Sequence, residues 1–194
     1  MKHLKLFFAY LLMSILSIGQ MWAADPVSTL TFTAACSGSG TADDDASWTV
    51  TSDAAESTYD ATKGVHYGTG KKAVSYLTLS TSDISGTITQ IKVNASGASG
   101  TSAKINVTVG GSAFDSEKSI SATATDYTLT GSASGEIIVS ITQTSATKAL
   151  YCKSIAVTYT TGGGGGGTPQ PTLFMDHRER LSISLIYNSI ITFR

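Results

Sequence analysis

The chain has 194 residues and a formal net charge of −1, from 13 Lys and Arg against 14 Asp and Glu. Its lysines are scattered singly apart from Lys71 and Lys72, and no stripe of basic residues runs through the sequence. Because such a stripe is the electrostatic footprint of a phosphate backbone, the composition argues against nucleic acid as a direct ligand.

The first 24 residues are typical of an export signal. Met1 to Lys5 is basic, Leu6 to Gly19 is apolar, and alanines at positions 23 and 24 suit a signal peptidase. The apolar run is shorter than the roughly 20 residues that span a bilayer. The sequence therefore predicts cleavage of residues 1–24, and a mature chain that is secreted, periplasmic or on the cell surface, without membrane contact.

Residues 25–161 alternate apolar with polar side chains in period 2. Segments of this kind are 28–34, 48–51, 74–79, 86–94, 103–109, 127–130, 136–141 and 150–159. Gly-rich turns separate them, and alternation of this kind is typical of antiparallel strands with one buried face. The pattern predicts an all-β fold, a two-sheet antiparallel β-sandwich and most simply a jelly roll, with a closed barrel as the alternative.

The phase of the alternation also predicts the core, because a residue's parity in a strand decides which face it occupies. Thirteen apolar residues are predicted to point inward: Leu30, Phe32, Val50, Leu77, Leu79, Ile91, Val93, Ile105, Val107, Ile137, Val139, Ile155 and Val157.

A run of six glycines starting at Gly162 ends the alternating region. With the Thr-Pro-Gln-Pro that follows, it predicts a linker over residues 162–171. The tail, residues 172–194, has no Gly or Ala and holds every arginine of the chain. It is either an interaction tail or a remnant left by a frameshift in the Gly-coding tract, and the break in composition favours the remnant.

Two cysteines, Cys36 and Cys152, lie in segments predicted to be the first and last strands. Terminal strands of a sandwich often end as neighbours, so one expectation is a disulfide, which could contribute up to about 4–5 kcal/mol through loop closure. The other is a pair of free thiols that pack as small apolar residues. The sequence leaves both open.

Within residues 25–161, His66 is the only histidine available as a catalytic base, and no Gly-x-Ser-x-Gly, phosphate-loop or metalloprotease motif accompanies it. Its setting between Val65 and Tyr67 is typical of a packed or partly exposed histidine in a strand. The sequence therefore predicts a chain that is not an enzyme.

The acidic residues Asp43, Asp44 and Asp45 are the candidate metal ligands, in a loop before Trp48. Calcium accepts such oxygen ligands in flexible geometry, so a structural calcium is the one cofactor considered. The alternative is an acidic loop whose repulsion water and salt screen. Three more acidic residues follow in the next loop: Asp53, Glu56 and Asp60.

Exposed aromatic rings that stack on the C–H face of a sugar are the candidate ligand contacts. Tyr59, Tyr67 and Trp48 lie at predicted strand ends or in loops. Tyr59 stands in a polar segment and is the best exposed platform, whereas the phase that Trp48 shares with Val50 favours burial.

Several segments carry a recognisable pattern: 63–68, 76–80, 91–96, 107–111, 134–139 and 148–157. They resemble the jelly-roll accessory modules of large secreted proteins of Gram-negative gut bacteria, which sit beside nucleases, glycosidases or further β domains. The resemblance covers about residues 27–160. It implies a galactose-binding-like sandwich without catalytic activity, in which a structural calcium sometimes occurs.

Composition, motifs and resemblance together predict a non-catalytic exported accessory module that binds carbohydrate or positions a partner domain, such as a missing C-terminal domain. The alternative is a structural spacer or an adhesin-like domain that contacts other proteins.

Overall fold

The computed structural model describes residues 24–54, 56–69, 72, 74–144 and 148–161. The predicted signal segment up to residue 23, the linker and the tail lie outside the described residues. Within them, every regular element is a β-strand. No helix in this part of the chain has the length and hydrophobicity needed to cross a membrane.

The strands are β1 (Val27–Thr31), β2 (Gly38–Thr41), β3 (Ser47–Ser52), β4 (Ser57–Asp60), β5 (Gly64–Tyr67), β6 (Tyr76–Thr81), β7 (Thr87–Gly97), β8 (Lys104–Val109), β9 (Ser112–Ala113), β10 (Lys118–Ser119), β11 (Thr125–Ala133), β12 (Ile137–Thr142) and β13 (Leu150–Thr160). They form two antiparallel sheets, as predicted. The β13 sheet has the order β11-β7-β13-β5-β4, and β1 also pairs with β13. The β12 sheet has the order β10-β8-β12-β6-β3-β2, and β9 pairs with β8.

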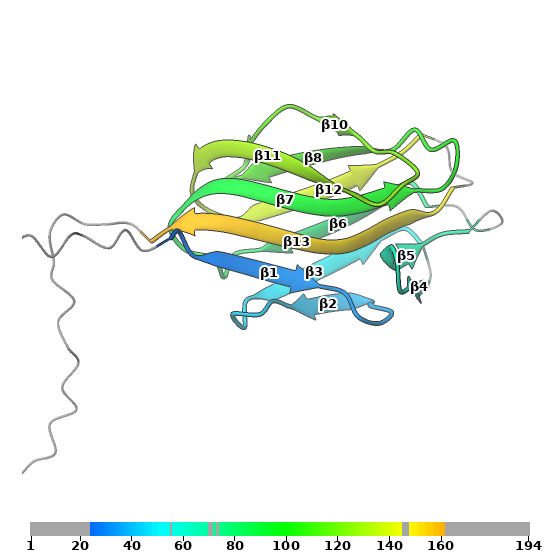
Figure 1. Ribbon diagram of the computed structural model, residues 1–194, viewed down its shortest axis with the longest axis horizontal. Helices are drawn as coiled ribbons and strands as arrows, with labels where there is room; N and C mark the ends of the chain where they lie inside the picture. The colour runs from blue at the N-terminus through cyan, green and yellow to red at the C-terminus, as the bar shows by residue number, and fades with distance from the viewer. Residues whose placement is uncertain (1–23, 55, 70–71, 73, 145–147, 162–194) are drawn as a thin grey trace, which may run out of the picture. The chain divides into compact units, whose positions relative to one another are not determined.

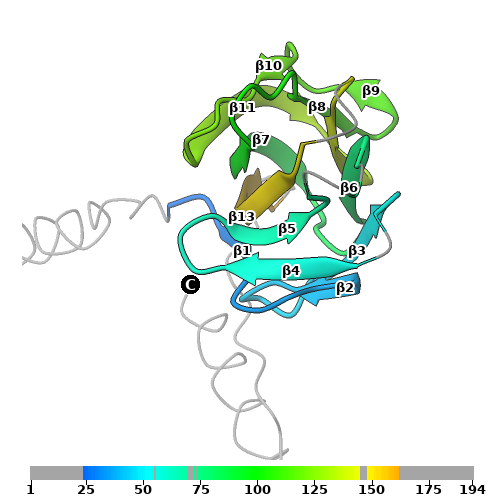
Figure 2. The same cartoon turned by 90° about the vertical axis from the view of Figure 1, so that its right-hand side faces the viewer.

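The two sheets lie one behind the other in Figure 1, with β11, β7 and β13 in front of β8, β12 and β6. Figure 2 shows the two layers from the end that carries β4 and β5. The space between them is filled by alternate residues of each strand. All thirteen residues predicted to point inward are buried, none more than 5% exposed, so the predicted core is confirmed.

Two strands lie where the sequence indicates turn or loop. Strand β2 falls in the Ser-Gly-Ser-Gly segment, and β4 falls in the polar stretch around Tyr59. Both are the last strand in the order of their sheet. Because an edge strand is paired on one side only and here buries few side chains, its sequence carries little of the alternation on which strand prediction depends.

Strand β13 organises its sheet. Along one edge it pairs with β7 over nearly its full length, and along the other it pairs first with β5 and then with β1. A bulge interrupts the β7 register between Cys152 and Ser154. It resets the alternation, so that Cys152 and Ile155 both point inward and Lys153 is an additional residue on the outer face.

The predicted disulfide is absent from the structure, in which Cys36 and Cys152 are both free. Cys36 lies beyond the end of β1, not within the first strand, and its thiol donates to the Ser39 carbonyl at 2.9 Å. Cys152 is fully buried opposite Val65 and Ala95, and β1 pairs with β13 only from Ser154 onward. The second expectation, two free thiols, describes this arrangement.

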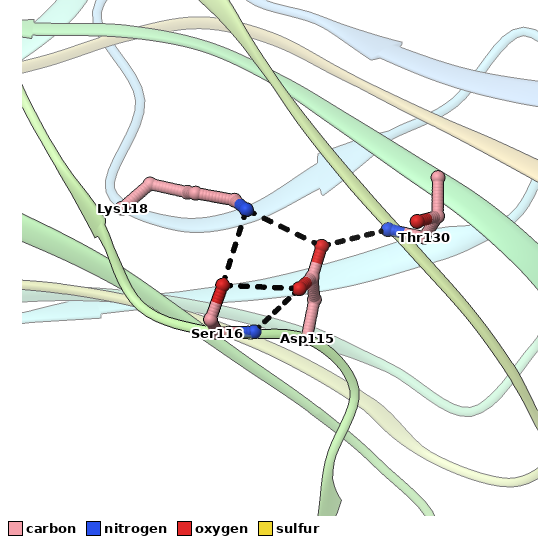
Figure 3. A network of polar contacts seen from close by, with 4 residues as sticks. All are labelled: Asp115, Ser116, Lys118 and Thr130. Atoms are coloured by element: carbon pink, nitrogen blue, oxygen red, sulfur yellow. Dashed lines mark hydrogen bonds and ion pairs between the residues drawn. The ribbon is translucent and has the colours of Figure 1, made fainter.

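The Asp115 carboxylate links the β12 sheet to β11, at the end of the β13 sheet. Asp115 follows β9, and its Oδ2 accepts the backbone N–H of Thr130 in β11 at 3.1 Å. The same oxygen lies 3.4 Å from the Lys118 ammonium, and Oδ1 accepts the Ser116 N–H at 2.6 Å, as Figure 3 shows. The hydrogen bond from the Thr130 N–H has the largest effect on the carboxyl, and that from the Ser116 N–H the next largest; they lower the pKa of Asp115 to about 2.

Candidate functional site

Two aromatic rings lie side by side on the outer face of the β13 sheet. Tyr151 of β13 pairs directly with His66 of β5, and His66 pairs with Thr58 of β4. The Tyr151 and His66 ring centroids are 4.9 Å apart, with a 33° angle between the planes. Their strand neighbours Val65 and Cys152 point into the core, so alternation directs the two rings outward. Both are half-buried.

The turn between β4 and β5 brings this pair together. Asp60 accepts the backbone N–H groups of Thr62 and Lys63 at 2.8 and 2.9 Å, which closes the turn. Gly64 then begins β5 with φ +89°, a conformation that L side chains rarely adopt. A Cβ at Gly64 would lie 2.2 Å from the Cys152 carbonyl oxygen. The glycine therefore lets β5 approach β13 closely enough to pair His66 with Tyr151.

Three shallow depressions open near the rings, two of them lined by His66. One of about 400 Å³ lies against both and is also lined by Ala98, Ser99 and Lys148. A second, of about 500 Å³, is lined by Lys63, Asn94, Lys153 and the loop before β11. A third, of about 220 Å³, lies on the Thr58 side of His66 and includes Glu56 and Lys72. The rings thus stand among hollows wide enough for several small cyclic groups.

Lysines border the rings. The Lys63 ammonium lies 4.7 Å from the Tyr151 ring centroid, and it donates to the Ala122 carbonyl at 3.3 Å. A cation held over an aromatic face is attracted by the ring quadrupole, which keeps Lys63 close to Tyr151. Lys148 precedes β13, and Lys153 stands at the bulge.

The site holds a neutral imidazole at neutral pH. Burial lowers the pKa of His66 below its usual value, and the negative charge of Asp60 opposes that shift. Burial, and then the Asp60 charge, raise the pKa of Tyr151. Both rings are therefore uncharged near pH 7 and offer an apolar face with polar edges.

Of the three aromatic residues proposed from the sequence, two are core residues. Trp48 is 1% exposed and Tyr67 is 3% exposed, so neither ring face can meet a ligand. The Tyr67 hydroxyl donates to the Cys36 carbonyl instead. Tyr59 is 40% exposed, but it stands on the edge strand opposite Val65, on the other face of the sheet from His66.

The acidic residues proposed as calcium ligands bond to the chain itself. Asp43 accepts the Thr29 N–H at 2.7 Å, and Asp44 accepts the Ser28 hydroxyl at 2.7 Å. Asp45 adopts φ +67° at the turn. In the described part of the chain, no three His, Cys, Asp or Glu side chains gather closely enough to hold a metal ion. Asp43 and Asp44 thus fasten their loop to β1.

His66 has a structural partner. The Thr58 hydroxyl lies 2.7 Å from its Nδ1, as expected for directly opposed residues on neighbouring strands. Among the described residues, no carboxylate hydrogen-bonds to the imidazole. The histidine is the partly exposed strand residue that the sequence indicated.

Sequence reasoning did not select Tyr151, Lys63, Lys148 or Lys153. The outward phase of Tyr151 is readable from Leu150 and Cys152 on either side of it. Nothing local shows that His66, 85 positions earlier, lies across from it, because that pairing follows from the order of strands in the sheet.

No protein-family model matches the chain, and no curated protein matches its sequence. Solved structures of similar fold include the module TmCBM61 in complex with β-1,4-galactotriose, 13% identical, covering 58% of this chain and 88% of that one with a TM-score of 0.45. Another is a CBM36 carbohydrate-binding module in complex with calcium and xylotriose, 18% identical, covering 56% and 93% with a TM-score of 0.37. At these identities the likeness concerns the sandwich fold alone.

Proposed function

We propose that residues 25–161 are a non-catalytic, exported accessory module that binds a saccharide on the outer face of the β13 sheet. The observation that carries the proposal is the half-exposed Tyr151–His66 pair, with its ring centroids 4.9 Å apart. A pyranose ring presents one face of C–H groups and a rim of hydroxyls. Two adjacent aromatic rings match that face, since an aromatic ring is apolar in its body and negative on its face.

The rim of the site supplies hydrogen-bonding groups for the hydroxyls. The Thr58 hydroxyl, which is bonded to the imidazole, and the Lys63 ammonium, which also donates to the Ala122 carbonyl, lie beside the rings and keep further hydrogen-bonding capacity. Groups held by rigid elements lose little conformational freedom on binding, which favours a ligand that makes only a few contacts. The wide, open hollows suit part of a longer glycan chain better than an enclosed small molecule.

Substitution of the rings tests this proposal. Tyr151→Ala and His66→Ala are each expected to weaken saccharide binding about tenfold, equivalent to ~1.4 kcal/mol. Tyr76→Ala is the matched control, because Tyr76 is 39% exposed on the outer face of the β12 sheet. Binding would be measured by affinity electrophoresis in a panel of soluble polysaccharides, and by calorimetry with oligosaccharides of those retained. Unchanged melting temperatures would show that the variants fold.

Two outcomes would reject the proposal. If the chain is retained by no polysaccharide but pulls down a protein from an extracellular extract, the module is a spacer or adhesin-like domain. If Tyr76→Ala weakens binding and Tyr151→Ala does not, the saccharide lies on the other sheet.

Calcium enters the test as a separate measurement. Since Asp43 and Asp44 already accept bonds from β1, we expect affinity and melting temperature to be the same in EDTA and in calcium. A rise in melting temperature with calcium, abolished by Asp44→Asn, would instead identify this loop as a metal site.

A further inference from the structure

The lysines of the described residues fall into two groups. Four form ion pairs with acidic side chains: Lys72 with Glu56, Lys92 with Asp126, Lys104 with Glu117 and Lys118 with Asp115. Three form none: Lys63, Lys148 and Lys153. Lys148 lines the hollow that lies against both rings, and Lys63 and Lys153 line the neighbouring hollow. The third hollow, on the Thr58 side of His66, contains the ion pair of Glu56 with Lys72.

The first two hollows contain no carboxylate. Their linings consist of the three lysines, His66, Tyr151 and uncharged residues. The acidic residue nearest in sequence, Asp60, is engaged by backbone N–H groups of its own turn. The charge of Asp60 still acts on Lys63, His66 and Tyr151, but around these two hollows the three lysines outnumber it.

The β13 bulge adds to this charge. Without the additional residue at 153, strict alternation would place one residue fewer on the outer face between Cys152 and Ile155. Bulges are over-represented beside functional sites, where they re-aim a side chain. In this bulge the additional residue, Lys153, lies on the same outer face as Tyr151, two positions along β13.

Two buried polar atoms nearby lack a partner. Ser96 pairs with Tyr151 across β7 and β13, and Asn94 pairs with Ser154 just past the bulge. The Ser96 Oγ and the Asn94 Oδ1 are buried without a hydrogen-bond partner in the structure, although most such atoms in proteins have one. Asn94 also lines the hollow with Lys63 and Lys153.

We propose that the saccharide bound here is acidic, with carboxylate or sulfate groups that the unpaired ammonium groups of Lys63, Lys148 and Lys153 neutralise while the sugar ring lies on Tyr151 and His66. This inference rests on the proposed function and assigns it a ligand class. Lysine suits such a ligand because its ammonium is a compact charge with rotatable donors on a flexible stem, which follows anions spaced along a chain.

The test compares glycans that differ in one kind of acidic group. Oligogalacturonate would be compared with its methyl ester, and chondroitin sulfate with its desulfated form, by calorimetry on the full chain. We expect one pair to discriminate, with the methyl-esterified or desulfated member binding at least tenfold more weakly; desulfated chondroitin keeps its uronate carboxylates, so that pair tests sulfate alone. The pair that responds identifies carboxylate or sulfate as the recognised group.

Lysine variants then locate the contact. Lys63→Gln, Lys148→Gln and Lys153→Gln should each weaken binding of the acidic glycan about two- to fivefold, as exposed charge pairs do. Lys104→Gln, which removes an ion-paired lysine from the β12 sheet, should leave the affinity unchanged. The affinity should also fall as salt is raised, because exposed charges are screened.

The outcomes separate the two proposals. If neutral glycans bind as tightly as acidic ones and the lysine variants change nothing, the acidic ligand is rejected while the saccharide site on Tyr151 stands. If no glycan of either kind binds, the proposed function fails. Equal affinity for single-stranded DNA would reject a saccharide-specific site in favour of general polyanion binding.

Discussion

The outer faces of the two sheets are built on the same alternation but differ in charge and shape. The outer face of the β12 sheet carries mainly Ser and Thr side chains, and Lys104 on this face is ion-paired with Glu117. The outer face of the β13 sheet also has an ion-paired lysine, Lys92 with Asp126, but it adds two adjacent rings, hollows and three lysines without an ion pair among the described residues. Folding constrains the inner residues of both sheets equally, so this difference between the outer faces is the reason that the proposed ligand site is placed on the β13 sheet.

The comparison depends on which residues point inward. Two substitutions in β13 test this assignment, and the first has the largest expected effect on the free energy of unfolding. Ile155→Asp should destabilise the fold by about 4 kcal/mol or more, because it buries an unpaired charge. Ala156→Asp, one position along and facing outward opposite Lys92, should cost about 1 kcal/mol or less. Urea denaturation measures both. Equal losses would mean that the face assignment of β13 is wrong.

One glycine at each sheet extends the comparison between the two sheets. Gly64→Ala should cost about 3 kcal/mol and weaken ligand binding, because φ is +89° and a Cβ would meet the Cys152 carbonyl. Gly111→Ala, at φ +81° in the β8–β9 turn with nothing within 4 Å, should cost about 1 kcal/mol and leave binding intact. The measurements are urea midpoints and glycan affinity. Matching effects at both positions would remove the argument that Gly64 sets the β5–β13 approach.

The Asp115 network gives a smaller, pH-dependent effect away from the proposed site. Its folded pKa of about 2 lies below the ordinary 3.8, so its stabilisation is complete above that value and is lost as pH falls towards 2. The melting temperature of Asp115→Asn should therefore lie below that of the wild type at pH 6, and the gap should close on acidification. Glycan affinity at neutral pH should not change. A gap that persists at pH 2 would assign the effect to geometry rather than charge.

The thiols give the smallest effect, a change in reactivity without a change in stability. Burial raises the pKa of Cys152 to about 12 and also raises that of Cys36, so both are protonated at pH 8 and react slowly with a disulfide reagent. Two thiols should titrate after unfolding in guanidinium without reductant. A count of zero would establish the Cys36–Cys152 bridge and link the loop after β1 to the strand that carries Tyr151.

Much of the fold is readable from the sequence because a half-buried strand repeats its burial every second residue. Ile91 and Val93, or Ile155 and Val157, identify their own faces without knowledge of the rest of the chain. Edge strands β2 and β4 escape this reading because few of their residues are buried. The core was therefore predictable and the sheet edges were not.

The site was harder to predict because its residues come together only through strand order. Trp48 and Tyr67 are the aromatic residues that composition draws attention to, yet both face the core. Tyr151 gains a partner from β5, and Lys63 reaches its ring from the β4–β5 turn. Neither relation follows from local sequence, since each depends on β13 pairing with β5 rather than only with β7.

The pairing of β1 with β13 has a mechanical consequence. Val27, at the start of β1, pairs with Thr158, near the end of β13, and the Tyr159 N–H donates to the Pro26 carbonyl at 3.1 Å. The entry and exit of the sandwich are therefore adjacent (Figure 1). Tension applied across these two points would load the β1–β13 hydrogen bonds one after another, as in unzipping, instead of together in shear. A module pulled from both ends of its chain should yield at low force, beginning with β1. One held by a single end and pulled through a ligand at the proposed site would keep that strand pair unloaded.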